Sequence, residues 1–65
     1  MLHYELKQLS EKRIECKTLT ARENIDKAID DVCEAIGLKR PHTLTINENS
    51  VEVAYGTYTN TYYLF

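Results

Sequence analysis

Two cysteines and two histidines are the side chains of this sequence that raise the question of a zinc site or a disulfide. They occur in the order His3, Cys16, Cys33 and His42, without the close ligand pairs from which structural zinc sites are usually built. The sequence also shows no secretory signal, so we expect both thiols to stay reduced as small buried hydrophobic residues. This pattern predicts no metal site and favours free thiols over a disulfide between Cys16 and Cys33.

Enzymatic motifs are missing from the sequence. Glycine occurs only at positions 37 and 56, which excludes a glycine-rich phosphate-binding loop and a Gly-x-Ser-x-Gly elbow. No local signature groups a serine, a histidine and a carboxylate for nucleophilic catalysis. We therefore expect a protein that is not an enzyme and that holds no cofactor.

Carboxylates recur along the middle of the chain at helical spacing. On a helix they fall within about 80° of one another, opposite an apolar stripe. Each pair of like charges at i,i+4 destabilises a helix by a few tenths of a kcal/mol, whereas a lysine in place of one of the two carboxylates would stabilise it. Such a face could dock on a basic partner protein, although a solvated face is the simpler interpretation. We call this set the acidic ridge: Glu23, Asp26, Asp30 and Glu34.

Aromatic residues dominate the segment GTYTNTYYLF, residues 56–65. A flat strand without proline or charge is an aggregation hazard when its edge is bare, so we expect another chain, most readily a second copy, to cover it. The predicted contacts with a partner or within a homodimer or higher oligomer are Tyr58, Tyr62, Tyr63 and Phe65.

Nucleic-acid binding is an alternative that uses the N-terminal residues. If this part forms strands, Lys7, Arg13 and Lys17 lie on the open face of a sheet, where cations and exposed rings could hold phosphates and bases. Glu5 and Glu15 lie between them, and the net charge of the chain is −2. The electrostatic attraction for a polyanion is therefore local and weak.

Length and composition indicate one small folded domain, residues 1–65, with 43% hydrophobic and 28% charged residues. A domain of about this size buries only about 60% of the surface of its unfolded chain, which makes association with a partner plausible. No stretch approaches the roughly 18 apolar residues of a membrane span. We expect a cytoplasmic protein without a membrane contact.

The acidic ridge needs a helix, and the sequence predicts one over residues 21–36. Thr20 and Glu23 form a capping box at its start, and Gly37 stands where a left-handed residue commonly ends a helix. The apolar stripe that faces the core consists of Ile25, Ile29, Val32 and Ile36.

A β-hairpin is predicted to follow, with strands at 42–47 and 50–55. A two-residue loop at Glu48 and Asn49 would place Ile46 opposite Val51, and Leu44 opposite Val53. A further strand over residues 61–65 is expected, with a loop centred on Tyr58 and Thr59. That loop would pair Tyr55 with Tyr62, and Val53 with Leu64. In this register Tyr62 and Leu64 face the helix, whereas Tyr63 and Phe65 lie on the open face. A slip of one residue would exchange the two pairs, and the sequence leaves both registers open.

The N-terminal residues fit two interpretations. Alternating apolar residues favour strands from Leu2 to Lys7 and from Arg13 to Lys17, with Leu9 in a turn around Ser10. Helix-forming Glu, Lys, Gln and Leu residues support a helix instead. The strand interpretation gives a β-β-α-β-β-β order, an α+β fold in which one amphipathic helix packs on a single antiparallel sheet.

From these observations we expect a small non-enzymatic protein-binding module, such as an inhibitor or accessory subunit. It would dock on a basic partner through the acidic ridge, pair through its aromatic C-terminal strand, or do both. A nucleic-acid-binding module and a structural homo-oligomer are the alternatives.

Overall fold

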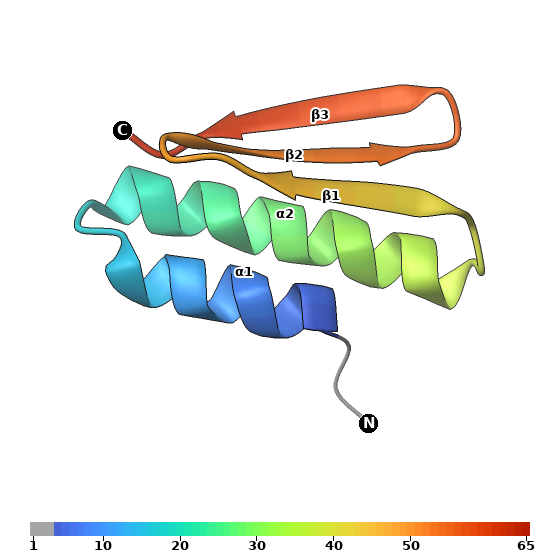
Figure 1. Ribbon diagram of the computed structural model, residues 1–65, viewed down its shortest axis with the longest axis horizontal. Coiled ribbons are helices and arrows are strands. Elements are labelled where there is room, and N and C mark those ends of the chain that lie inside the picture. Colours follow the sequence, from blue (N-terminus) through green and yellow to red (C-terminus); the bar gives the residue numbers. More distant parts are fainter. Residues whose placement is uncertain (1–3) are drawn as a thin grey trace.

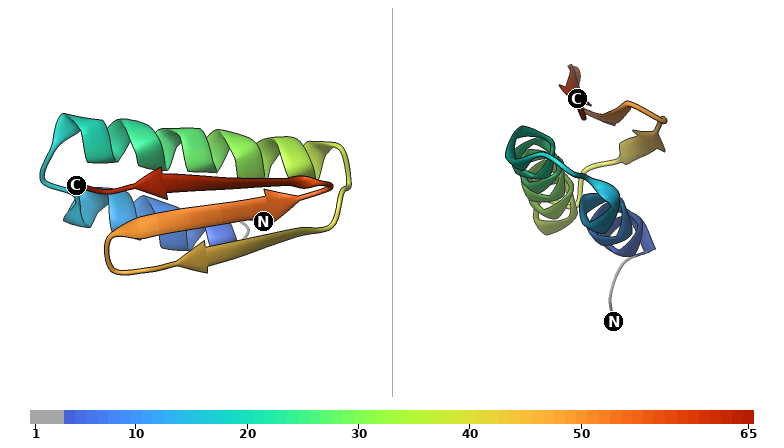
Figure 2. Two further views of the ribbon diagram at one scale, coloured as in Figure 1. Left: turned by 90° about the horizontal axis from the view of Figure 1, so that it is seen from above. Right: turned by 90° about the vertical axis from the view of Figure 1, so that its left-hand side faces the viewer.

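Two helices pack on one face of a three-stranded antiparallel sheet in the computed structural model, which describes residues 4–65 (Figure 1). The strands follow one another across the sheet in the order β1-β2-β3. Helix α2 runs alongside β3, and α1 lies behind the other two strands (Figure 2). The elements are α1 (Tyr4–Glu15), α2 (Leu19–Gly37), β1 (His42–Ile46), β2 (Ser50–Tyr55) and β3 (Tyr58–Tyr63).

Helix α1 corrects the predicted fold, because residues 4–15 form a helix where two strands were expected. The order is therefore α-α-β-β-β, with two helices, and not β-β-α-β-β-β. The helix-forming residues outweigh the alternation, and Leu9, which the strands placed in a turn, is fully buried against α2 and the sheet. Leu2 and His3 lie outside the described residues.

Helix α2 begins earlier than its capping box suggested. Thr18 is the N-cap, and its hydroxyl accepts the N–H of Ala21 at 3.1 Å, so the prediction that Thr20 caps the helix is wrong. At the other end Gly37 is still helical. The left-handed residue is Lys39, with φ of 55°, and the N–H of Leu38 bonds the Glu34 carbonyl.

The first hairpin has the predicted register, with Ile46 opposite Val51 and Leu44 opposite Val53. The second hairpin differs from the prediction, because its two-residue loop is Gly56 and Thr57 and its strand is 58–63 in place of 61–65. Gly56 has φ of 60°, a conformation that glycine adopts without strain and that tight hairpin turns require.

The change in register keeps the side chains on their expected faces. Tyr62 lies opposite Val51 and not opposite Tyr55, a shift of four residues along β2. An even shift leaves each side chain on the same face of a strand. Tyr62 and Leu64 therefore pack toward the helices, and Tyr63 and Phe65 are exposed, as predicted.

The core lies between the two helices and the sheet and contains no buried polar side chain among the described residues. Alanines at positions 21, 28 and 35 are buried on α2, together with Ile25 and Val32. The largest fully buried side chains are Leu9, Ile25, Val32, Val51 and Val53. Neither helix has the length and apolar character needed to cross a lipid bilayer within residues 4–65.

Candidate functional site

Strand β3 forms one edge of the sheet, and its sequence YTNTYY contains neither a charged residue nor a proline. In an antiparallel strand the backbone N–H and C=O of one residue point to the same side, and those of the next residue point to the opposite side. The N–H of Leu64 bonds the Asn49 carbonyl on the β2 side at 2.9 Å, so Tyr62 and Asn60 also face β2. The outward N–H and C=O groups belong to Thr59, Thr61 and Tyr63, which we call the β3 edge.

One group of the β3 edge is already bonded. Asn24 of α2 donates a hydrogen bond from Nδ2 to the carbonyl of Tyr63 at 2.6 Å. Within residues 4–65 no hydrogen bond reaches the outward N–H and C=O of Thr59 and Thr61. These backbone groups are open to a strand from another chain.

Three of the four predicted aromatic contact residues are on the surface. Tyr58 is 64% exposed, Tyr63 56% and Phe65 78%. The rings of Tyr63 and Phe65 meet edge to face, with centroids 5.6 Å apart. Tyr62 points the other way, into the contact between β3 and α2.

Asp31 of α2 binds the inner side of β3 and was missed in the sequence. Its Oδ2 accepts the Tyr62 hydroxyl and the Asn60 side-chain amide, the latter at 3.2 Å. Burial, and then the hydrogen bond to Asp31, raise the pKa of Tyr62 well above its ordinary value. A signal was present, because Asp31 lies three residues after Ala28 and four before Ala35, beside the buried face of α2.

The acidic ridge is only partly available for a partner. Glu23 and Asp30 are exposed and form no ion pair with any of the described residues. Asp26 accepts a hydrogen bond from Arg13 Nε at 2.9 Å, which ties α1 to α2. Glu34 is also exposed and accepts the Tyr55 hydroxyl at 3.2 Å. The ridge thus offers three exposed carboxylates and one that is paired.

The basic sheet face predicted for nucleic acid depended on the N-terminal strands, which α1 replaces. Lys7 and Arg13 lie on α1, and Lys17 lies in the loop before α2. The strands themselves, residues 42–65, contain no lysine or arginine. The strands therefore supply no lysine or arginine to the open face of the sheet that could bind a phosphate. That face carries threonines instead, at positions 43, 45, 59 and 61.

The cysteines and His42 have separate environments. Both thiols are free; Cys16 is buried as expected, but Cys33 is exposed, so the prediction that both are buried is wrong for Cys33. His42 Nε2 lies 2.6 Å from Glu5 Oε2 and joins β1 to α1. No group of three potential metal ligands occurs in the part of the chain that the structure describes.

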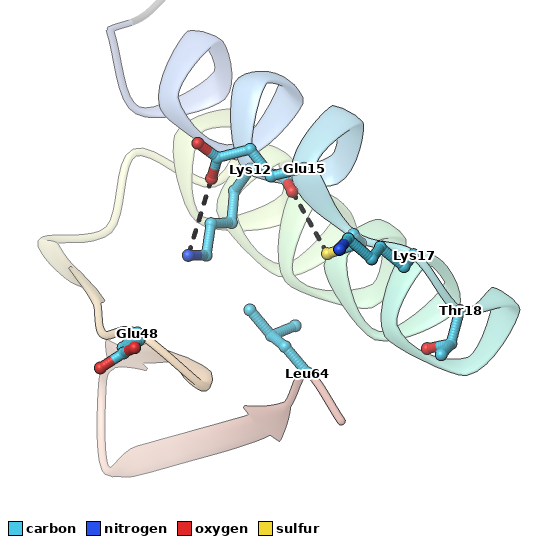
Figure 3. Close-up of a pocket in the computed structure, with 7 residues that line it drawn as sticks. Lys12, Glu15, Lys17, Thr18, Glu48 and Leu64 are labelled. Atoms are coloured by element: carbon cyan, nitrogen blue, oxygen red, sulfur yellow. Dashed lines mark hydrogen bonds and ion pairs between the residues drawn. The ribbon is translucent and has the colours of Figure 1, made fainter.

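A pocket of about 230 Å³ lies where the loop between the helices meets Glu48 and Leu64 (Figure 3). Lys12 forms an ion pair with Glu15 at 3.7 Å, and Cys16 Sγ donates to the Lys12 carbonyl. Lys12 and Lys17 are balanced by Glu15 and Glu48, so the charges of the lining favour neither an anion nor a cation.

Comparison with known proteins finds no family model, no curated protein and no solved structure that matches this chain.

Proposed function

We propose that this chain is a small non-enzymatic protein-binding module that pairs its β3 edge with an extended strand of a partner protein. The observation that supports this function is the row of open backbone groups at Thr59 and Thr61 on a strand without charge or proline. When an extended segment joins a sheet edge, backbone hydrogen bonds supply affinity and the neighbouring side chains supply specificity.

The exposed aromatic side chains suit this role. Tyr58 lies at the start of β3, and Tyr63 and Phe65 lie at its end, so rings flank the open backbone groups. Aromatic residues are enriched at protein interfaces because they bury a large area at a small cost in side-chain entropy. A strand bound at the β3 edge would have apolar contacts at both of its ends.

The acidic ridge is the second contact surface that we propose. Glu23, Asp30 and Glu34 would attract a partner with a basic surface and accelerate its association. These carboxylates lie on the side of α2 opposite the buried alanines. A partner could therefore contact the acidic ridge with one part of its surface and the β3 edge with another. A module of this kind could serve as an inhibitor or accessory subunit, and its free thiols fit a reducing compartment such as the cytoplasm.

Charge inserted at one edge of the sheet tests the proposed function. Thr43, Ala54 and Thr59 lie in one row across the open face, so Thr43→Lys on β1 is a matched control for Thr59→Lys on β3. Each variant is used as a tagged bait in extracts of cells that also express the untagged chain. We expect Thr59→Lys to lose bound protein that the unsubstituted chain and Thr43→Lys retain.

The same experiment separates the two surfaces. Asp30→Lys as a fourth bait should lose partners that depend on the acidic ridge and should keep those that depend on the β3 edge. If all baits capture the same proteins in the same amounts, neither surface binds a partner and the proposed function is wrong.

A further inference from the structure

Resting on this proposed function, we propose that the strand bound at the β3 edge is β3 of a second copy. The two strands run antiparallel, with the two Asn60 residues facing each other on the two-fold axis. The result is a continuous six-stranded sheet, built from two three-stranded sheets, with the helices of both copies on the same face.

The open backbone groups select this register. A two-fold axis can place Thr59 opposite Thr61 of the second copy, Thr61 opposite Thr61, or Thr59 opposite Thr59. The last arrangement places Thr61 opposite Thr57, which lies in the loop before β3 and offers no strand to pair with. The second arrangement places Thr59 opposite Tyr63, whose carbonyl is already bonded to Asn24. The first uses only the groups that no described residue bonds, and each Thr59–Thr61 pair exchanges both of its N–H···O bonds.

The side chains fit the same register. Tyr58 of one copy lies opposite Tyr62 of the other, on the face that carries the helices. Tyr58 is exposed in the single chain and would pack there against a ring that the Asp31 hydrogen bond holds in place. Thr59 of one copy and Thr61 of the other lie side by side on the open face, where threonine pairs across neighbouring strands are favourable.

Charge favours a second copy at this edge. An isologous interface brings each residue close to its own equivalent, and residues 58–63 carry no charge that would be repelled or desolvated. Asn60 meets its equivalent as a neutral amide that already donates to Asp31. A two-fold interface on the acidic ridge would place carboxylates against carboxylates, so the ridge is left to a different protein.

Single cysteines test the register in a Cys33→Ser background, which removes the exposed native thiol. Asn60→Cys places two thiols at the axis, where Cα atoms about 4.5 Å apart lie within reach of a disulfide. Thr59→Cys and Thr61→Cys are matched controls, because the equivalent residues of the two copies are offset by two positions and lie more than about 7 Å apart. We expect mild oxidation to cross-link only Asn60→Cys.

The unsubstituted chain supplies a measurement that does not depend on how the cysteine variants fold. Sedimentation should give twice the 7.6 kDa mass of one chain at micromolar concentration. Hydrogen exchange at the amides of Thr59 and Thr61 should slow as the concentration rises, whereas that of Tyr63 should not change.

Several results would overturn this inference. Cross-linking of Thr61→Cys with protection of Tyr63 would show the other register. A chain that sediments as a monomer at 100 µM would exclude the second copy, and a dimer without slowed exchange at Thr59 and Thr61 would show that another surface associates. If Thr59→Lys still loses a different protein in the capture experiment, the proposed function stands and only the second-copy inference fails.

Discussion

Leu9→Ala should destabilise the protein far more than Ile14→Ala, although both remove a large aliphatic side chain from α1. Leu9 is 0% exposed and is the one fully buried residue of α1, whereas Ile14 is 80% exposed. Truncating a buried leucine costs about 2–5 kcal/mol, because the transfer free energy is lost and a cavity is left. A surface substitution such as Ile14→Ala changes stability by about 0.5 kcal/mol or less.

The expected loss is large for a chain of this size. At about 0.05–0.15 kcal/mol per residue, 65 residues give a total stability of about 3–10 kcal/mol. Each kcal/mol lowers the midpoint of thermal unfolding by about 4–8 °C in a domain this small. Leu9→Ala should therefore unfold at least about 8 °C below the unsubstituted chain. Urea titration and thermal melts followed by circular dichroism measure both quantities.

This pair of variants also separates the two interpretations of the N-terminal residues. Two strands would place Ile14 on the core face and Leu9 in a turn, and Ile14→Ala would then be the more damaging change. A larger effect of Ile14→Ala, or equal effects of the two substitutions, would refute the packing of α1 described above.

Two further predictions concern single side chains. Tyr62→Phe removes the hydroxyl that Asp31 accepts and should cost about 1–2 kcal/mol at neutral pH. Because the pKa of Tyr62 is raised in the folded chain, its contribution is present below pH of about 10 and is lost as the pH rises further. Above about pH 10 the stability of the unsubstituted chain should thus fall more steeply than that of Tyr62→Phe, and parallel curves from urea titrations would contradict this. A thiol reagent should modify exposed Cys33 quickly in the folded chain. It should modify Cys16, which is 8% exposed, only when the chain unfolds. Equal rates for the two thiols would show that Cys16, between α1 and α2, is not buried.

The sequence contained enough information for β1 and β2 but not for α1. Alternation from His42 to Tyr55 agrees with the residue types of both strands and with their short loop, so three kinds of signal predict the same hairpin. In α1, alternation at Tyr4 and Leu6 conflicted with helical propensity, and Tyr4 proves to be exposed. Alternation over so few residues is weak evidence, because a helix can show it by chance.

Some parts of the candidate site could be predicted from the sequence and others could not. Residue types alone indicated an uncharged aromatic strand near the end of the chain. Of the two registers left open, the one with a loop at Tyr58 and Thr59 gave the observed faces, because its error was an even number of residues. Asn24 and Asp31 could not be assigned their roles, because their partners on β3 depend on where α2 crosses the sheet. That crossing is set by side-chain packing between elements distant in sequence, which periodicity does not encode.

The hydrogen bond from Asn24 to Tyr63 limits how the strand can be extended. Fibril-forming segments usually need six or seven consecutive residues that pair along a flat edge. With the Tyr63 carbonyl occupied, the outward groups of the β3 edge that no described residue bonds are those of Thr59 and Thr61, which is too short a stretch for that kind of stacking. An antiparallel two-fold pair also uses each β3 edge once and leaves no β3 edge for a third copy. One amide side chain on a neighbouring helix thus shortens the open edge of an aromatic, uncharged strand, and it leaves open the two residues at which we propose that a partner strand binds.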